Sequence, residues 1–248
     1  MLTSMYGWLF LASLCGCHAF RPSCYVDDLS PRAIGDNIWF CVFLSTRPAR
    51  KMVFQIKVDE AAELRLQGSR EFALENLSQP LYTWVTTSIF DSTPADPLNC
   101  SDGNDIEGRG HGASCPQIYA QSTAVSQLTN LVVNMQNGEV TSFAWDNTCS
   151  GCSPSKCLKS SRSLSRENYT EGSQFFSRGT CGEGSDFCVG TPAACNLKVF
   201  VTFAGTDKFG RNLLSAGSRL SKLAGPTLSS LYNTLKDGYA QASQALGK

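Results

Sequence analysis

Residues 128–145 read LTNLVVNMQNGEVTSFAW, and this stretch decides the fold class. Two largely apolar segments, Leu128–Met135 and Glu139–Trp145, flank the dipeptide Asn137-Gly138. Asn and Gly tolerate the positive φ angles of a type I′ turn, whose twist matches that of the strands it joins. The stretch therefore predicts a β-hairpin.

Apolar runs on both sides of this hairpin predict further strands. Ile38–Leu44 is rich in aromatic and β-branched residues, which is typical of a strand buried on both faces. Met52–Val58 alternates strictly from Val53 onward. The other expected strands are Leu64–Gln67, Glu71–Leu77, Leu81–Phe90, Leu197–Phe203 and Arg211–Ala216. Because no amphipathic helix separates these runs, the pattern predicts a mainly β fold, either an antiparallel β-sandwich or a barrel-like sheet.

Two long stretches have the composition of loops. Asp91–Gln117 contains three prolines and four glycines, and Cys149–Thr191 is rich in Ser, Gly and Cys. Loops of this length are unusual unless they are functional or cross-linked, and both carry cysteines. The sequence therefore predicts long disulfide-pinned loops on the sheets. The expected pairings are Cys100 with Cys115, and local pairing among Cys181, Cys188 and Cys195.

The C-terminal segment has a different period. Pro226 suits the first turn of a helix. Apolar residues then recur every three or four positions, at Leu228, Leu231, Leu235, Tyr239, Ala242 and Leu246. This pattern predicts a C-terminal amphipathic helix that packs on its own sheet. The alternatives are that the helix mediates association with a partner or a second copy, or that it adsorbs to a membrane surface.

The N-terminal segment Met1–Ala19 has the features of a signal peptide. Its apolar run, Tyr6–Leu14, is shorter than the roughly 20 residues that span a bilayer. No basic residue precedes the run, so a buried first strand or helix is the alternative, and Leu14–Cys17 also resembles a bacterial lipobox. We expect a signal peptide over 1–19, a disulfide-braced β domain over 20–217 and a helical segment over 218–248.

Ten cysteines follow this leader, an even number. They are Cys24, Cys41, Cys100, Cys115, Cys149, Cys152, Cys157, Cys181, Cys188 and Cys195. Behind an export signal they predict a disulfide framework formed in an oxidising compartment. Sequons at Asn76, Asn99 and Asn168 predict N-glycosylation. We therefore expect a secreted, extracellular protein with no transmembrane segment.

Net charge and the scarcity of histidine narrow the possible functions. The 21 basic and 21 acidic residues give a formal net charge of zero, so the chain lacks the long-range field that gathers nucleic acid or an anionic membrane. His111 is the only histidine after the leader, which excludes multi-histidine zinc sites. A Ser-His-Asp triad would need His111 as its base, and the sequence has no Gly-x-Ser-x-Gly motif that would mark the serine nucleophile.

Two short motifs are weak candidates for a chemical site. Cys149-Ser-Gly-Cys152 has the spacing of a redox dithiol, although structural disulfides are the simpler interpretation. Oxygen ligands for a weak calcium site are offered by Asp102, Asn104, Asp105 and Glu107. No catalytic residue is predicted, and calcium is the only candidate cofactor.

The function predicted from these features is that of a secreted binding or structural module, whose partner is a glycan or a surface protein. An exposed Trp84 or Trp145 would stack on sugar rings, although core packing is the commoner fate of tryptophan. The alternative is a secreted hydrolase acting on polysaccharide. Such an enzyme needs two carboxyl groups about 5–9.5 Å apart across a cleft.

Overall fold

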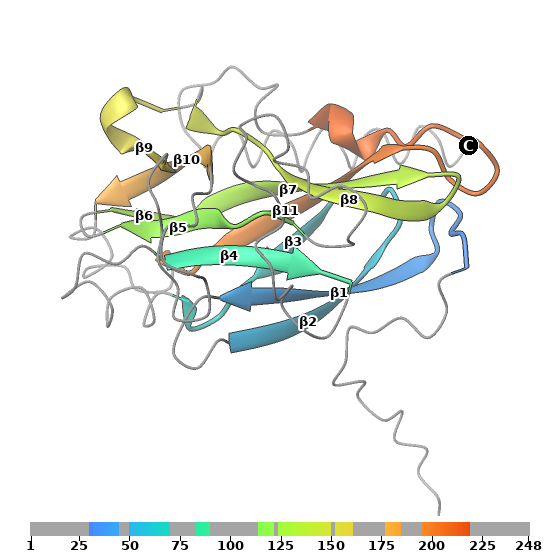
Figure 1. Ribbon diagram of the computed structural model, residues 1–248, viewed down its shortest axis with the longest axis horizontal. Coiled ribbons are helices and arrows are strands. Elements are labelled where there is room, and N and C mark those ends of the chain that lie inside the picture. Colours follow the sequence, from blue (N-terminus) through green and yellow to red (C-terminus); the bar gives the residue numbers. More distant parts are fainter. Residues whose placement is uncertain are drawn as a thin grey trace, which may run out of the picture.

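A computed structural model describes residues 30–44, 50–69, 83–89, 114–121, 124–149, 152–160, 177–184 and 195–218. These residues form eleven strands and two short 3-10 helices (Figure 1). The strands are β1 (Asn37–Leu44), β2 (Arg50–Lys57), β3 (Ala62–Arg65), β4 (Thr83–Ser88), β5 (Gln117–Gln121), β6 (Ala124–Ser126), β7 (Leu128–Gln136), β8 (Glu139–Trp145), β9 (Cys157–Ser160), β10 (Ser177–Gly184) and β11 (Lys198–Gly205). The 3-10 helices are η2 (Pro154–Lys156) and η4 (Ser215–Ser218).

The strands form two sheets. The seven-stranded sheet has the order β2-β1-β4-β5-β6-β10-β9, and each of its pairs is antiparallel. The four-stranded sheet has the order β3-β11-β7-β8. The prediction of a mainly β fold with antiparallel sheets is confirmed, with one exception: β11 runs parallel to β7. The chain visits β9 and β10 in the other sheet before it returns as β11, and such a long connection permits a parallel pair.

The predicted β-hairpin is confirmed. β7 and β8 pair antiparallel up to Gln136 and Glu139, with a register shift between Asn134 and Met135. At the turn, Asn137 has a φ angle of 51° and Gly138 one of 83°. Both residues thus adopt the left-handed conformation that the Asn-Gly dipeptide predicted.

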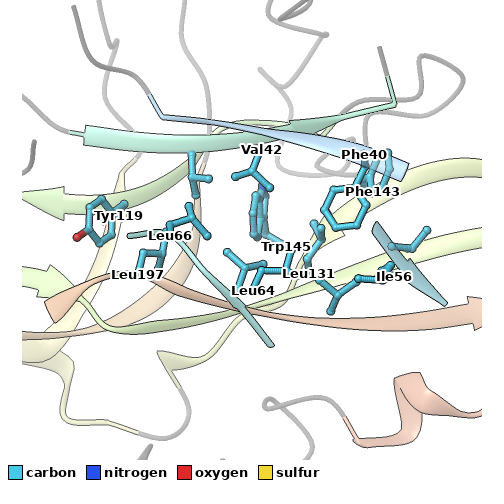
Figure 2. Close-up of a cluster of buried hydrophobic side chains, with 14 of the residues drawn as sticks. Phe40, Val42, Ile56, Leu64, Leu66, Tyr119, Leu131, Phe143, Trp145 and Leu197 are labelled. Carbon is cyan, nitrogen blue, oxygen red and sulfur yellow. The ribbon is translucent and has the colours of Figure 1, made fainter. Parts of the chain in front are cut away.

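An apolar cluster of buried residues lies between the two sheets (Figure 2). Phe40 and Val42 from β1 face Leu131 from β7 and Trp145 from β8 across this space. On the other face of β1, Cys41 and Phe43 are also buried, and the side chain of Val53 from the neighbouring strand β2 packs against them. The prediction that the first strong strand is buried on both faces is confirmed.

Three strands arise in stretches that composition assigned to loops. β5 begins at the end of the first stretch, and β9 and β10 lie within the second. β10 contains three glycines, which disfavour strands in isolation. A Cβ on Gly179 would lie 2.5 Å from Cys149 Sγ, and one on Gly182 would lie 2.8 Å from a methyl of Leu158. Close packing against neighbouring segments therefore explains glycine at these positions.

One further expected strand is contradicted by the structure, and three predicted segments lie where the structure gives no description. The strand predicted over Arg211–Ala216 is wrong, because only an isolated bridge joins Thr206 to Asn212 before η4 begins. Glu71–Leu77, the leader and the C-terminal amphipathic helix lie outside the described residues.

Candidate functional site

Three turns lie together at one end of the two sheets, on the right of Figure 1. They are residues 32–36 before β1, residues 137–138 between β7 and β8, and residues 206–214 after β11, and we call them the loop end. Backbone hydrogen bonds join them. The N–H of Arg32 donates to the carbonyl of Gly138 at 2.8 Å, the N–H of Lys208 to that of Arg32 at 2.9 Å, and the N–H of Gly138 to that of Thr206 at 3.0 Å.

Gly138 lies at the centre of this junction. A Cβ at this position would lie 2.6 Å from both the backbone N and O of Arg32, and 2.8 Å from the backbone N of Lys208. Its positive φ angle adds a second requirement for glycine. The hairpin turn therefore also fixes the distance between the other two turns.

Asp207 organises the third turn from inside. Its side chain is fully buried, with 0% exposure. Oδ1 accepts the backbone N–H groups of Phe209 and Arg211, both at 2.9 Å. Oδ2 accepts the backbone N–H of Ile34 at 3.3 Å, together with Nε of Arg211 at 2.8 Å and Nη2 at 2.6 Å. One carboxylate therefore ties the third turn to the segment before β1.

The pKa of Asp207 reflects these donors. Burial alone would raise the pKa of this carboxyl, but the Arg211 guanidinium and the backbone N–H groups of Arg211, Ile34 and Phe209 outweigh burial and hold the pKa well below its usual range. Asp207 is therefore ionised at neutral pH and serves as an acceptor.

Two further carboxylates brace the loop end. Asp36 accepts the N–H of Ala33 at 2.7 Å and lies 3.5 Å from Lys208 Nζ. The Ala33 bond and the charge of Lys208 lower the pKa of Asp36 despite partial burial. Asp59 accepts the N–H of Leu214 at 2.9 Å and that of Ser215 at 2.8 Å. Asp36 and Asp59 thus hold parts of the loop end in place through hydrogen bonds from its backbone N–H groups.

The loop end also carries the exposed apolar side chains. Three large hydrophobic side chains are exposed in the described part of the chain, and all belong here: Ile34, Phe209 at 69% and Leu214 at 60%. Lys208 Nζ and Arg211 Cζ each lie 5.3 Å from the centroid of the Phe209 ring, within the range of cation–π interactions. An exposed aromatic ring flanked by two cations therefore lies on a braced turn.

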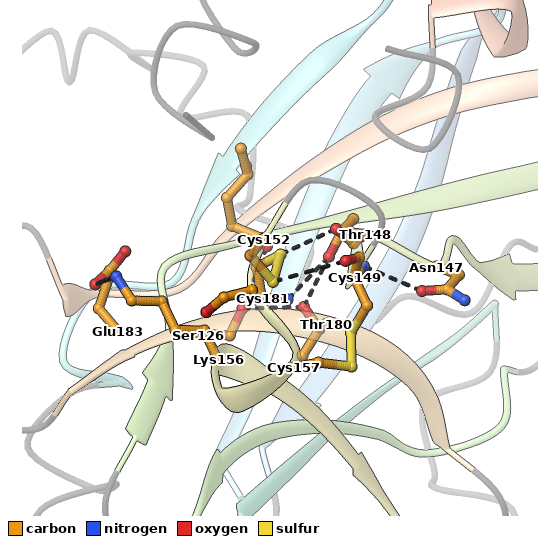
Figure 3. The surroundings of a disulfide bond; sticks show 12 residues. Ser126, Asn147, Thr148, Cys149, Cys152, Lys156, Cys157, Thr180, Cys181 and Glu183 are labelled. Atoms are coloured by element: carbon orange, nitrogen blue, oxygen red, sulfur yellow. Dashed lines mark hydrogen bonds and ion pairs between the residues drawn. A yellow bond between two sulfur atoms is a disulfide. The ribbon is translucent and has the colours of Figure 1, made fainter. Parts of the chain in front are cut away.

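A second feature is the pair of disulfides on β9 and β10 (Figure 3), on the left of Figure 1. Cys149 pairs with Cys157, and Cys152 pairs with Cys181. Local pairing of Cys181 with a later cysteine is thus wrong, because the β9–β10 register places Cys181 opposite Cys157, close to the chain segment that carries Cys152. The two cysteines of the CxxC motif have different partners, which favours structural bridges over a redox dithiol.

Hydrogen bonds extend around these bridges. Thr148 donates through Oγ1 to Thr180 at 3.4 Å, and Ser126 lies 3.1 Å from Thr180. At the surface, Lys156 pairs with Glu183 at 2.7 Å. These contacts brace β9 and β10, which are poor in apolar residues. Elsewhere in the described ranges, Cys41, Cys115 and Cys195 are also disulfide-bonded.

Other predicted site residues fall outside the described ranges. They are Cys24, Cys100, Cys188, the glycosylation candidates Asn76, Asn99 and Asn168, the calcium candidates Asp102, Asn104, Asp105 and Glu107, and His111. The Cys100–Cys115 bridge therefore stays a prediction. Over the described ranges, no group of three or more His, Cys, Asp or Glu could hold a metal ion. No helix in those ranges has the length and apolarity that crossing a membrane requires.

The tryptophans proposed for sugar stacking lie in the interior of the protein. Trp84 and Trp145 are both buried, and Trp145 Nε1 donates to the carbonyl of Cys115 at 2.7 Å. Among the residues that the structure describes, Phe209 is the strongly exposed aromatic side chain, in a segment that the sequence identified only as a turn. No sequence signal singled out Phe209, because the exposure of a turn residue depends on which distant segments cover it.

Comparison with known proteins gives one partial match. A family model described as "Uncharacterised protein DDB_G0273449" matches residues 115–233, just under half of the chain. The matched region includes β5 to β11, both described disulfides and the turn that carries Phe209, but not the segment before β1. No curated protein and no solved structure matches the chain.

Proposed function

We propose that this protein is a secreted extracellular binding module whose loop end binds another protein. The observation that carries the proposal is the gathering of Ile34, Phe209 and Leu214 on braced turns. A single exposed apolar side chain is ordinary, whereas a group at one end is typical of an interaction surface.

The bracing favours tight binding. Asp207, Asp59 and Gly138 fix the turns through hydrogen bonds and close backbone contact. A surface that is already ordered loses little conformational entropy when a partner binds, so more of the contact energy appears as affinity. The loop end is in this respect preorganised.

The composition of the surface favours a protein over a glycan as partner. Aromatic residues and arginine are enriched at the energetic centres of protein interfaces, and Phe209 and Arg211 supply both. Ile34 and Leu214 add aliphatic surface, which the apolar side chains of a protein cover more fully than a largely hydroxylated sugar does. Trp84 and Trp145, the residues suited to stacking, are buried.

Secretion is supported by the disulfides. Cys149–Cys157 and Cys152–Cys181 are bridges of a kind that forms and persists in oxidising compartments. Together with the leader at Met1–Ala19, they support an extracellular location.

The alternative function, that of a secreted polysaccharide hydrolase, is not supported by the carboxyl groups of the loop end. A general acid in a glycosidase needs a carboxyl group whose pKa is raised. Asp36 and Asp207, the carboxyl groups of the loop end with a resolved pKa shift, are both shifted downward. They act as acceptors for backbone and for cations.

A binding screen tests the proposal. The full chain and the double variant Phe209→Ala Leu214→Ala would be applied to a panel of purified extracellular proteins and, in parallel, to a glycan array. Gln55→Ala, an exposed position on β2, is the control. We expect at least one protein whose affinity falls tenfold or more in the double variant and stays unchanged in the control. Binding that ignores the double variant, or that occurs only on glycans, would contradict the proposal.

A further inference from the structure

The carboxylates and the cations of the loop end differ in how far internal partners occupy them. Asp207 accepts five donors and is fully buried. Asp59 accepts the backbone N–H groups of two successive residues, and Asp36 accepts that of Ala33. These acids are largely committed to holding their own chain.

The two cations beside Phe209 keep donors for a ligand. Arg211 uses Nε and Nη2 for Asp207, which leaves Nη1, and its side chain is 54% exposed. Lys208 is also exposed, and its described contacts are Asp36 at 3.5 Å and the Phe209 ring. An ammonium group has three donors, so Asp36 does not exhaust it. Unused positive donors therefore flank an exposed aromatic face.

We propose that Lys208, Phe209 and Arg211 form a subsite for a carboxylate that stands next to an apolar side chain in the partner protein. The inference rests on the proposed binding function and specifies the partner's chemistry. The carboxylate accepts from Arg211 Nη1 and Lys208 Nζ, and such charge-assisted bonds are stronger than neutral ones. The neighbouring apolar group packs on the Phe209 ring.

The rest of the loop end favours a polypeptide over an acidic glycan. Ile34 lies on the turn before β1, and Leu214 lies on the same turn as Phe209; both extend the apolar surface. A segment in which acidic and apolar side chains alternate satisfies the cations and covers these residues together. A sulfated sugar would pair the cations and leave both aliphatic side chains in water.

Two synthetic peptides test the subsite with the full chain. In one labelled peptide Asp alternates with Leu and Phe, and in the matched peptide Asn replaces every Asp. Fluorescence anisotropy at low salt measures both affinities. We expect the Asp peptide to bind about tenfold more tightly, the equivalent of one or two charge-assisted bonds. Rising salt should erode this preference, since the subsite is exposed.

Substitutions at Lys208 and Phe209 test whether these residues account for the preference for Asp and for peptide binding. Lys208→Gln should reduce the preference for Asp severalfold, whereas Lys57→Gln, which removes the same charge from a lysine paired with Glu60, should leave it unchanged. Phe209→Ala should weaken both peptides. Equal affinity for the two peptides, a preference indifferent to Lys208→Gln, or binding of heparin without binding of either peptide would overturn the subsite. If the panel proteins still depend on Phe209 and Leu214 in that case, the binding module stands and only the carboxylate specificity fails.

Discussion

Asp207 is fully buried, yet the groups that bond its oxygens all belong to the exposed loop end. A carboxylate suits this task because two oxygens accept several N–H groups at once, from backbone and from a guanidinium. Substituting it removes the common acceptor of two turns while leaving the apolar core intact.

Asp207→Asn should lower the melting temperature by several degrees at pH 7. Because the folded-state pKa of Asp207 is lowered, its stabilisation is fully present above the unfolded pKa of about 4 and is lost as the pH falls through that value toward the folded pKa. The gap in melting temperature between wild type and variant should therefore shrink between pH 5 and pH 3. Thermal unfolding at pH 7, 5 and 3 checks this, and a constant gap would contradict the assigned role.

Gly138→Ala should cost more stability than Gly210→Ala. Both positions have positive φ, 83° and 75°, which costs alanine about 1–2 kcal/mol. Gly210 has open space around it, whereas a Cβ on Gly138 would collide with the backbone of Arg32 and Lys208. Overpacking should add about 1–3 kcal/mol at Gly138 alone. Denaturant unfolding measures both, and equal costs would show that the close contact relaxes freely.

For single residues, the sequence predicted backbone conformation better than it predicted the exposure of side chains. Asn137 and Gly138 specify their turn through their own backbone preferences, so the prediction needed no tertiary information. The exposure of Phe209 and the burial of Trp84 depend on which segments cover them, and one residue's neighbours in sequence carry no such information.

Among the elements, β7 and β8 follow directly from their apolar runs, because those runs face the shared core. β6, β9 and β10 are short or rich in glycine and polar residues, and they form because neighbouring strands and disulfides hold them. Propensity cannot reveal strands of this kind, since their stability is tertiary. The parallel pairing of β7 with β11 could not be predicted for the same reason, because it depends on how distant segments pack together.

The two bridges beside β9 and β10 should contribute unequally to stability. In the chain-entropy model, closing the 29-residue separation of Cys152–Cys181 stabilises by roughly 3.6 kcal/mol, and closing the 8-residue separation of Cys149–Cys157 by about 2.5 kcal/mol. The double variant Cys152→Ala Cys181→Ala should therefore unfold at lower denaturant than Cys149→Ala Cys157→Ala. The reverse order would indicate that packing around the shorter bridge dominates.

Across the whole molecule, the core and the loop end should be separable by mutation. Phe143→Ala, at a fully buried core position, should cost about 3–5 kcal/mol. Phe209→Ala and Leu214→Ala should change stability by less than about 1 kcal/mol, since both side chains are largely exposed. Unfolding of each variant checks the contrast. A large loss at Phe209 would make that residue structural.

The most direct test of the binding surface is hydrogen exchange on the full chain, with and without the extracellular protein identified by the panel. We expect slower exchange in residues 32–36 and 206–214, with no change in residues 152–158 beside the disulfides. Protection confined to residues 152–158, or spread over the sheets without the loop end, would contradict it.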